Sequence, residues 1–375
     1  MRRAAILLAS LSILSISALA LAGALVDSRR ADAYFESELL CGERADFEGV
    51  SISASTSLSG LIGNRLYYGL SYDAASDESA CEYSFNERTS RSASADTDKE
   101  PVYAGLQVYF EDGAVRWKLY DPQSHEELGS GTSEELGALT EGAQNLRCSR
   151  LGGSWVIEAA YTDTAEYWLL ASRWSEEYGL YVPDAGTLSH VKSCSSLSTV
   201  GEAPGGGLLL LEKAGADYLL SQFDASGRLL REFAVEGAEN LHFADYAWGG
   251  DWVTVDVLGT VHSFVLREGL LERGEVYRLA DAPGCRYFVS ETEDGILFYY
   301  ERQYSFDGER LCLLVEEKAT QYQEASDAGV PLPEPGLWLI AAYPDGSVSS
   351  LGLRCSMWDN SGDGNYIYRL GFDKE

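Results

Sequence analysis

The segment TEGAQNLRCSRLGGSWVIEAAY (residues 140–161) occurs a second time in the chain as VEGAENLHFADYAWGGDWVTVDVL (residues 235–258). Five of the first seven positions are identical in the two copies. Each copy continues with two adjacent glycines, one further residue, a tryptophan and a valine, so that Trp155 matches Trp252 after an insertion of only two residues. Two matched segments that stay in register indicate an internal repeat. We therefore expect both tryptophans to begin the second strand of equivalent units.

Intermediate copies follow the same pattern, in which a small residue or a histidine after a short strand precedes a glycine-rich turn and an apolar strand. The marker residues are Cys148, Cys194, His242, Cys285 and Cys355. Their spacing predicts a unit of about 47 residues, with full units starting near residues 140, 187, 235 and 281 and a half unit opening at the last cysteine. Because a repeated position has a repeated environment, we expect the four cysteines to be small buried thiols, too far apart for disulfides or a shared metal.

A second hairpin appears in the units, as YLLSQFDASGRLLREF (residues 218–233) and WLIAAYPDGSVSSLGL (residues 338–353) show. Asp and Gly in the turns tolerate the positive φ angles of tight hairpins. Each unit therefore reads as four strands. In period and hairpin pattern, residues 140–375 resemble β-propeller proteins in general, with no specific family indicated. The resemblance implies about five four-stranded units, with a polar, proline-bearing loop insertion near residues 319–336.

Composition agrees with an all-β protein, because 38 Gly and 23 Tyr accompany only 9 Pro. Residues 34–138 alternate in polarity, which predicts a separate, small β-sandwich-like domain. In the alternative arrangement, the hairpin GLQVYFEDGAVRWKLYD (residues 105–121) completes the half unit at Cys355 and closes a ring of five units.

The N-terminal residues 1–30 carry the clearest signal for location. Two arginines precede 23 uncharged residues, Ala4 to Val26, which are enough to cross a hydrocarbon core as a helix. This length favours a retained membrane anchor, while the Ala18-Leu19-Ala20 and Ala22-Gly23-Ala24 sequences fit a cleaved signal peptide. In both cases the rest of the chain is expected to lie outside the cytoplasmic membrane.

Charge and cysteine content exclude several classes of partner. The net charge of −31 repels phosphate backbones, so we expect no nucleic-acid partner. Seven cysteines leave at least one thiol unpaired, and none of the spacings is typical of a zinc site. The disulfide state of Cys41 and Cys81 stays open.

Catalytic motifs are absent from the sequence, so no catalytic residue and no cofactor is predicted. Trp248, Trp252 and Asp251 form a weak ligand-binding candidate, because sugar rings stack on aromatic side chains. The sequence DNSGDGN offers Asp359, Ser361 and Asp363 as calcium ligands. The glutamate of an EF-hand loop is replaced by Leu370, which makes an ordinary hairpin turn the stronger interpretation.

The sequence therefore predicts an extracytoplasmic binding or sensor protein that is membrane-tethered or secreted and not catalytic. An extracellular protein or a glycan is the expected type of partner. Two alternatives remain: a carbohydrate-active hydrolase with paired carboxylates in a propeller pocket, and a structural envelope protein.

Overall fold

The computed structural model describes residues 34–59, 65–86, 101–195, 198–203, 207–237, 245–249, 251–279, 282–286, 290–291, 296–321, 336–356 and 367–372. Strands make up most of these residues, and the one α-helix among them is the short α2 (Glu134–Leu139). The chain divides into two compact units. Unit 1 combines residues 1–93 with residues 278–375, and unit 2 consists of residues 94–277.

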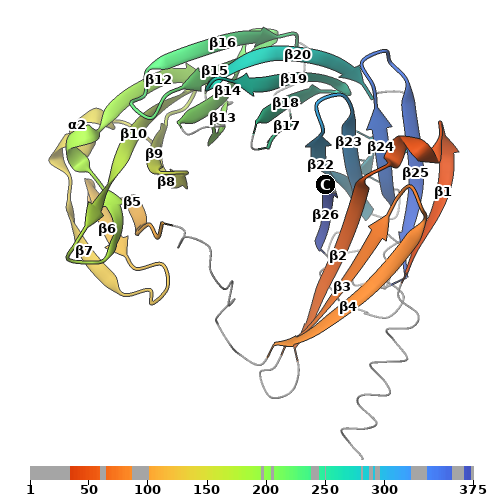
Figure 1. Ribbon diagram of the computed structural model, residues 1–375. Coiled ribbons are helices and arrows are strands. Elements are labelled where there is room, and N and C mark those ends of the chain that lie inside the picture. The colour runs from red at the N-terminus through yellow and green to blue at the C-terminus, as the bar shows by residue number, and fades with distance from the viewer. Residues whose placement is uncertain are drawn as a thin grey trace, which may run out of the picture. The chain divides into compact units, whose positions relative to one another are not determined.

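Unit 2 contains consecutive antiparallel sheets in which strands pair in chain order (Figure 1). The first sheet is β5 (Gly105–Glu111), β6 (Ala114–Tyr120) and β7 (Glu127–Thr132). The second is β8 (Asn145–Leu151), β9 (Ser154–Ala160), β10 (Thr164–Ser175) and β11 (Leu180–Pro183), with β12 (Ser189–Ser195) also paired to β10. The third is β13 (Ser198–Glu202), β14 (Leu208–Ala214), β15 (Asp217–Phe223) and β16 (Leu229–Val235). The fourth is β17 (Asp245–Trp248), β18 (Trp252–Val257), β19 (Thr260–Arg267) and β20 (Leu270–Arg278).

This succession of antiparallel sheets of three to five strands, two of them four-stranded, confirms the propeller-like repeats. Trp155 lies at the start of β9 and Trp252 begins β18, each in the second strand of its sheet, with the β13–β16 sheet between them in the chain. The predicted equivalence of the two tryptophans is therefore confirmed. The paired residues Leu151 and Ser154 leave Gly152 and Gly153 as a two-residue turn. A φ of 54° at Gly152 explains the glycine there.

Unit 1 joins the two ends of the chain. One sheet has the order β1 (Phe35–Cys41), β25 (Val348–Cys355), β24 (Leu337–Ala342), β23 (Leu311–Gln321), β22 (Ile296–Phe306) and β21 (Ser290–Glu291). The other has the order β26 (Ile367–Phe372), β2 (Val50–Ser59), β3 (Arg65–Asp73) and β4 (Glu78–Asn86). The last strand of the chain thus completes a sheet whose other three strands come from its beginning.

This pairing corrects the predicted division of residues 34–138 from residues 140–375. A separate β-sandwich domain is not seen, because β2 pairs with β26 from Val50–Phe372 to Ser55–Ile367. The half unit after Cys355 is completed by β2–β4, and not by residues 105–121, which form β5 and β6 of unit 2. The described strands of residues 140–375 lie in five sheets, as predicted for about five units, and β5–β7 form a sixth sheet before them.

The predicted starts of the units are also displaced. First strands begin at Asn145, Ser198, Asp245 and Ser290, several residues after the predicted positions. The loop insertion predicted at residues 319–336 cannot include its first three residues, because residues 319–321 belong to strand β23.

The cysteines occupy different places in the sheets, so their predicted equivalence is wrong. Cys148 lies in the first strand β8, Cys194 lies in β12, and Cys355 ends β25. Cys285 precedes β21 and lies outside the strands. The seven cysteines, all of which lie in the described residues, are not in disulfides. Cys194, Cys285 and Cys355 are buried as predicted, whereas Cys148 is half-buried.

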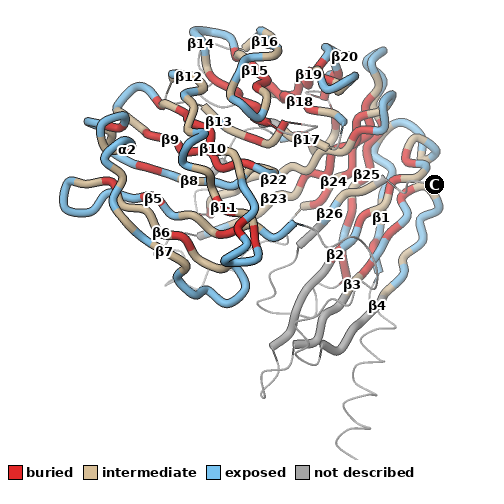
Figure 2. The backbone as a smooth tube through the Cα atoms, turned by 60° about the vertical axis from the view of Figure 1, so that its left-hand side comes forward, coloured by how far each residue is buried: buried red, intermediate tan, exposed pale blue. Residues whose placement is uncertain are grey.

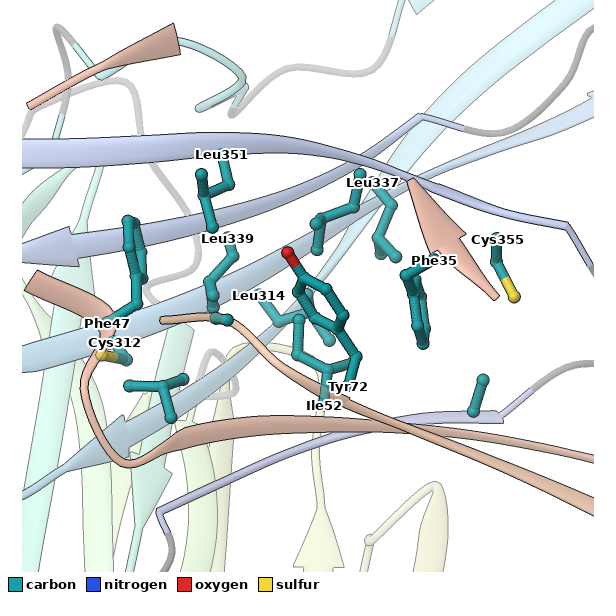
Figure 3. Close-up of a cluster of buried hydrophobic side chains, with 14 of the residues drawn as sticks. Phe35, Phe47, Ile52, Tyr72, Cys312, Leu314, Leu337, Leu339, Leu351 and Cys355 are labelled. Atoms are coloured by element: carbon teal, nitrogen blue, oxygen red, sulfur yellow. The ribbon is translucent and has the colours of Figure 1, made fainter. Parts of the chain in front are cut away.

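Each unit has its own apolar core. In unit 1, Phe47, Ile52 and Tyr72 pack against Leu314 and Leu339, as Figure 3 shows. In unit 2, separate clusters fill the spaces between successive sheets, and buried residues alternate with exposed ones along many strands (Figure 2). Burial of apolar surface at about 25 cal/mol per Å² is the main stabilising contribution.

The predicted N-terminal helix (residues 4–26) and the calcium candidate (residues 359–365) lie outside the described residues. In the part of the chain that the structure describes, no helix is long and apolar enough to span a membrane.

Candidate functional site

A cavity of about 300 Å³ lies within unit 2, between the β5–β7 sheet with helix α2 and the β8–β11 sheet. Its volume is at the lower end of the range for small-molecule sites. Its lining is mostly apolar. The lining residues are Leu106, Val108, Trp117, Leu119, Leu128, Gly129, Ser133, Glu135, Leu136, Ile157, Leu170, Arg173, Tyr178, Val182, Pro183, Ala185 and Leu188.

Helix α2 forms one wall of the cavity. Its N-cap is Ser133, whose hydroxyl oxygen accepts a hydrogen bond from the backbone N–H of Leu136 at 3.2 Å. The hydroxyl of Thr140, the C-cap residue, donates to the carbonyl of Leu136 at 2.7 Å. These bonds fix a helix of six residues that would be too short to form alone. They also hold the buried Leu136 side chain against the cavity.

Trp117 of β6 forms a second wall, and the neighbouring strand β7 is built to accommodate it. A Cβ atom at Gly131 would lie 3.1 Å from the indole ring, and a Cβ atom at Gly129 would lie 3.7 Å from it. A side chain at Gly131 would therefore press on the ring, whereas a Cβ atom at Gly129 would only touch it. The sequence ELGSGT of β7 is the local signal for this arrangement.

The floor of the cavity is apolar, and its mouth is charged. Ile157 of β9 and Leu170 of β10 are buried in the same core cluster. Glu135, Arg173 and Tyr178 line the cavity but are exposed residues. The hydroxyl of Tyr178 donates to the carbonyl of Leu128 at 3.1 Å, which anchors the 176–179 turn beside β7. An apolar interior with a few polar groups at the entrance suits a small amphipathic ligand.

The ligand candidates predicted from the sequence lie elsewhere. Trp252 is half-buried, and its indole lies so close to Gly249 that a Cβ atom there would overlap the ring. Asp251 is exposed, and its backbone carbonyl accepts a hydrogen bond from Leu266 at 2.7 Å. Trp248 is the last residue of β17, and only its backbone is described. None of the three lines the cavity, and their role in binding stays a prediction.

A polar cluster between the second and third sheets of unit 2 has a structural character. Lys192 of β12 forms ion pairs with the buried Glu212 of β14 and, at 3.0 Å, with Glu232 of β16. Burial acts to lower the pKa of Lys192, but hydrogen bonds from its ammonium group to Glu212 and Glu232 outweigh it and raise that pKa. The hydrogen bond from Lys192 is the main reason why the pKa of Glu232 is lowered. The ammonium group is therefore held in its charged form and is unsuited to act as a general base.

Thiol and metal chemistry find no support in the described residues. Burial raises the pKa of the Cys148 thiol to about 12 and that of Cys194 to about 11, so both are protonated and poorly nucleophilic at neutral pH. No group of three or more His, Cys, Asp or Glu residues in the described part of the chain is arranged to hold a metal ion.

Sequence reasoning missed the cavity because residues 105–138 were expected to belong to another domain than residues 140–188. A cavity between two sheets produces no recognisable pattern in the sequence of either sheet alone. The one local indication was the pair Gly129 and Gly131, which follow Trp117 closely in the sequence.

Comparison with known proteins gives distant likenesses only. No protein family matches the sequence, and no curated protein matches it. Among solved structures, a protein from Lactobacillus plantarum is 11% identical, with 81% of each chain covered and a TM-score of 0.34. The Dos1 propeller is 12% identical over 80% of this chain and 82% of that chain, with a TM-score of 0.31. The β-propeller domain of the Trilobed protease from Pyrococcus furiosus, described as having an open velcro topology, is 9% identical over 83% of this chain and 94% of that chain, with a TM-score of 0.28. The propeller-like arrangement described above rests on the strand pairing of this chain itself.

Proposed function

We propose that this chain is an extracytoplasmic, non-catalytic binding protein, tethered to the membrane by residues 4–26 or secreted after their removal. Its ligand site is the cavity between α2, β6 and β9–β11. The observation that carries the proposal is a mostly apolar cavity of about 300 Å³ whose two charged lining residues, Glu135 and Arg173, are exposed. Such a volume takes a small ligand rather than a polymer.

The entrance favours a ligand with an anionic group. The guanidinium of Arg173 offers a planar pair of donors that matches a carboxylate. Arg173 is the one cation and Glu135 the one carboxylate among the residues that line the cavity, so the anionic group of the ligand is expected beside Arg173. The ligand class is therefore a small apolar carboxylate whose hydrocarbon body lies between Leu106, Ile157 and Leu170.

Hydrolysis of a glycoside is less well supported by the cavity. A retaining or inverting glycosidase uses two carboxyl groups that face each other across the bond to be cleaved. Glu135 is the one carboxylate among the residues that line this cavity. A single exposed carboxylate can hold or repel a ligand but cannot supply both an acid and a nucleophile or base.

Calorimetric titration of the purified protein (residues 31–375) with decanoate and with 1-naphthoate tests the proposal. We expect saturable binding of at least one of them, with a negative heat-capacity change from apolar burial. Decanol and naphthalene-methanol, which lack the charge, should bind at least tenfold more weakly. Absence of heat with both acids, together with an unchanged melting temperature, would contradict the proposed ligand class.

Variants locate the site. Leu106→Trp fills the cavity and should abolish binding, whereas Arg173→Gln should weaken it by tenfold or more by removing the carboxylate partner. Arg231→Gln is the matched control, because Arg231 is an exposed arginine of β16 that does not line the cavity. Equal losses with Arg173→Gln and Arg231→Gln would show that binding is unspecific and electrostatic.

Cell fractionation tests the location separately. The full chain should be found with membranes or in the medium, and a chain lacking residues 4–26 should stay in the cytoplasm. Recovery of the full chain in the cytoplasm would contradict the location and leave the ligand assignment untouched.

A further inference from the structure

Three aromatic side chains form a connected group at one end of the β10–β11 pair, which we call the aromatic row. Trp174 of β10 meets Tyr181 of β11 edge to face, with ring centroids 5.3 Å apart. Tyr181 stacks on Tyr103 with ring centroids 5.1 Å apart and an interplanar angle of 30°. Trp174 is 52% exposed, the most exposed of the large hydrophobic residues described. None of the three lines the cavity of the proposed function.

Backbone hydrogen bonds hold the row in place. The N–H of Tyr181 donates to the carbonyl of Val102 at 2.9 Å, and the N–H of Ala104 donates to the carbonyl of Tyr181 at 2.8 Å. Trp174 and Tyr181 are directly opposite in the register of β10 and β11. The rings of Tyr103 and the buried Trp155 are 6.0 Å apart. The exposed Trp174 ring is therefore held against the half-buried Tyr181 and Tyr103 before any ligand arrives, which reduces the entropy lost on binding.

The Gly152–Gly153 turn brings polar groups to the same end of the sheet. The guanidinium of Arg150 lies 4.7 Å from the centre of the Tyr103 ring and donates to the carbonyl of Gly152 at 2.7 Å. A Cβ atom on Gly153 would lie 3.4 Å from the hydroxyl of Tyr103, and one on Gly152 would overlap the carboxylate of Glu202. Tyr103, Arg150 and Glu202 thus lie beside one backbone segment, and the lack of a Cβ atom at Gly152 leaves room for the Glu202 carboxylate.

We infer that the aromatic row, with Arg150 and Glu202, is a surface site for a neutral oligosaccharide. The C–H faces of sugar rings pack on aromatic rings, and a planar guanidinium and a carboxylate can each bond two adjacent hydroxyl groups. Sulfated or uronic glycans are disfavoured, because the chain carries a net charge of −31. This site is separate from the cavity and takes a different class of ligand.

Affinity electrophoresis in gels that contain soluble glucan, xylan, mannan or chitin oligomers tests the inference with the chain of residues 31–375. At least one neutral polymer should retard the protein. Trp174→Ala should remove at least nine-tenths of the retardation, and Trp174→Phe should keep part of it because an aromatic face remains. Phe110→Ala is the matched control, since Phe110 of β5 is a 40% exposed aromatic residue outside the row.

Two outcomes would overturn the inference: no retardation by any neutral polymer, or equal loss with Trp174→Ala and Phe110→Ala. Retention of the protein by a proline-rich peptide column, abolished by Trp174→Ala, would also overturn it and assign the row to polyproline recognition. The Leu106→Trp variant should bind sugar normally, so failure here is distinguishable from failure of the cavity proposal.

Discussion

His262 of β19 is buried, and in the described part of the chain neither of its ring nitrogens has a hydrogen-bond partner. Its pKa is lowered chiefly by burial and further by the positive charge of Arg273, while Glu236 acts in the opposite direction. The imidazole is therefore neutral in the folded protein near pH 7, and the unfolded chain binds the proton more readily.

This difference gives the stability a pH dependence. The contribution of His262 is fully present above its unfolded pKa of about 6.5 and is lost as the pH falls below that value. Each unit by which the pKa of His262 is lower in the folded than in the unfolded protein corresponds to about 1 kcal/mol of unfolding free energy. Between pH 7 and pH 5, the wild type should lose this contribution, whereas His262→Phe should not. Denaturant titrations at both pH values measure this, and parallel losses in the two proteins would show that another group titrates.

Gly152 is constrained by its backbone and by its neighbour at once. Its φ is 54°, and a Cβ atom there would overlap the carboxylate of Glu202. Gly215 opens a comparable two-residue turn, with a φ of 65° and nothing within 4 Å of its added Cβ.

The Glu202 carboxylate is the far end of a flexible side chain and can move aside, so Gly152→Ala and Gly215→Ala should each reduce the unfolding free energy by the backbone strain of about 1 kcal/mol. Thermal unfolding of the two variants checks this. A clearly larger loss with Gly152→Ala would show that the Glu202 side chain is held in place and cannot move aside.

At the scale of elements, strand β12 links two sheets of unit 2. It pairs with β10 in one sheet, and its Lys192 reaches Glu212 and Glu232 on strands of the next. The side chain of Glu212 is only 8% exposed. Loss of the lysine would leave this carboxylate buried without its cation, which is strongly unfavourable.

Lys192→Met should lower the unfolding free energy by about 3 kcal/mol, and adding Glu212→Gln should recover part of the loss. Lys118→Met is the control, since its ion pair with Glu127 is exposed and screened by solvent, so its loss should change the unfolding free energy little. Urea titrations at pH 7 give both values. A loss as small as that of the control would mean that Lys192 does not hold the two sheets together.

The repeat could be predicted at this scale because its signal is local. Paired glycines and the tryptophan that follows them occur within a few residues, and in both copies the tryptophan lies at the start of a second strand. The cysteine positions gave wrong equivalences, because a small buried side chain fits an edge strand, a loop or a central strand equally well. The cavity and the aromatic row combine residues from separate strands, so no single stretch of sequence predicts either of them.

At the scale of the whole molecule, the decisive feature lies in unit 1, where β26 near the end of the chain pairs with β2 near its beginning. A repeat period says nothing about which strand fills an incomplete sheet, because that pairing is non-local. Residues 34–86 alternate in polarity as a sandwich would, yet β2 lies between β3 and β26.

A disulfide tests this pairing. Ser53 and Arg369 are exposed partners in the register of β2 and β26, and opposite Cα atoms at about 5 Å lie within the range that a disulfide spans. Ser53→Cys with Arg369→Cys should cross-link on oxidation and raise the melting temperature. Ser51→Cys with Arg369→Cys is displaced by two residues and should not. Peptide mapping identifies the linkage, and equal cross-linking of both pairs would contradict the register.

The binding proposal is tested most directly by diffraction from crystals of the protein with 8-bromooctanoate, using the anomalous signal of bromine. We expect one bromine peak inside the cavity between α2 and β9, among Leu136, Ile157 and Leu170, with the carboxylate directed to Arg173. An empty cavity at saturating ligand, or bromine only at other places on the molecule, would contradict it.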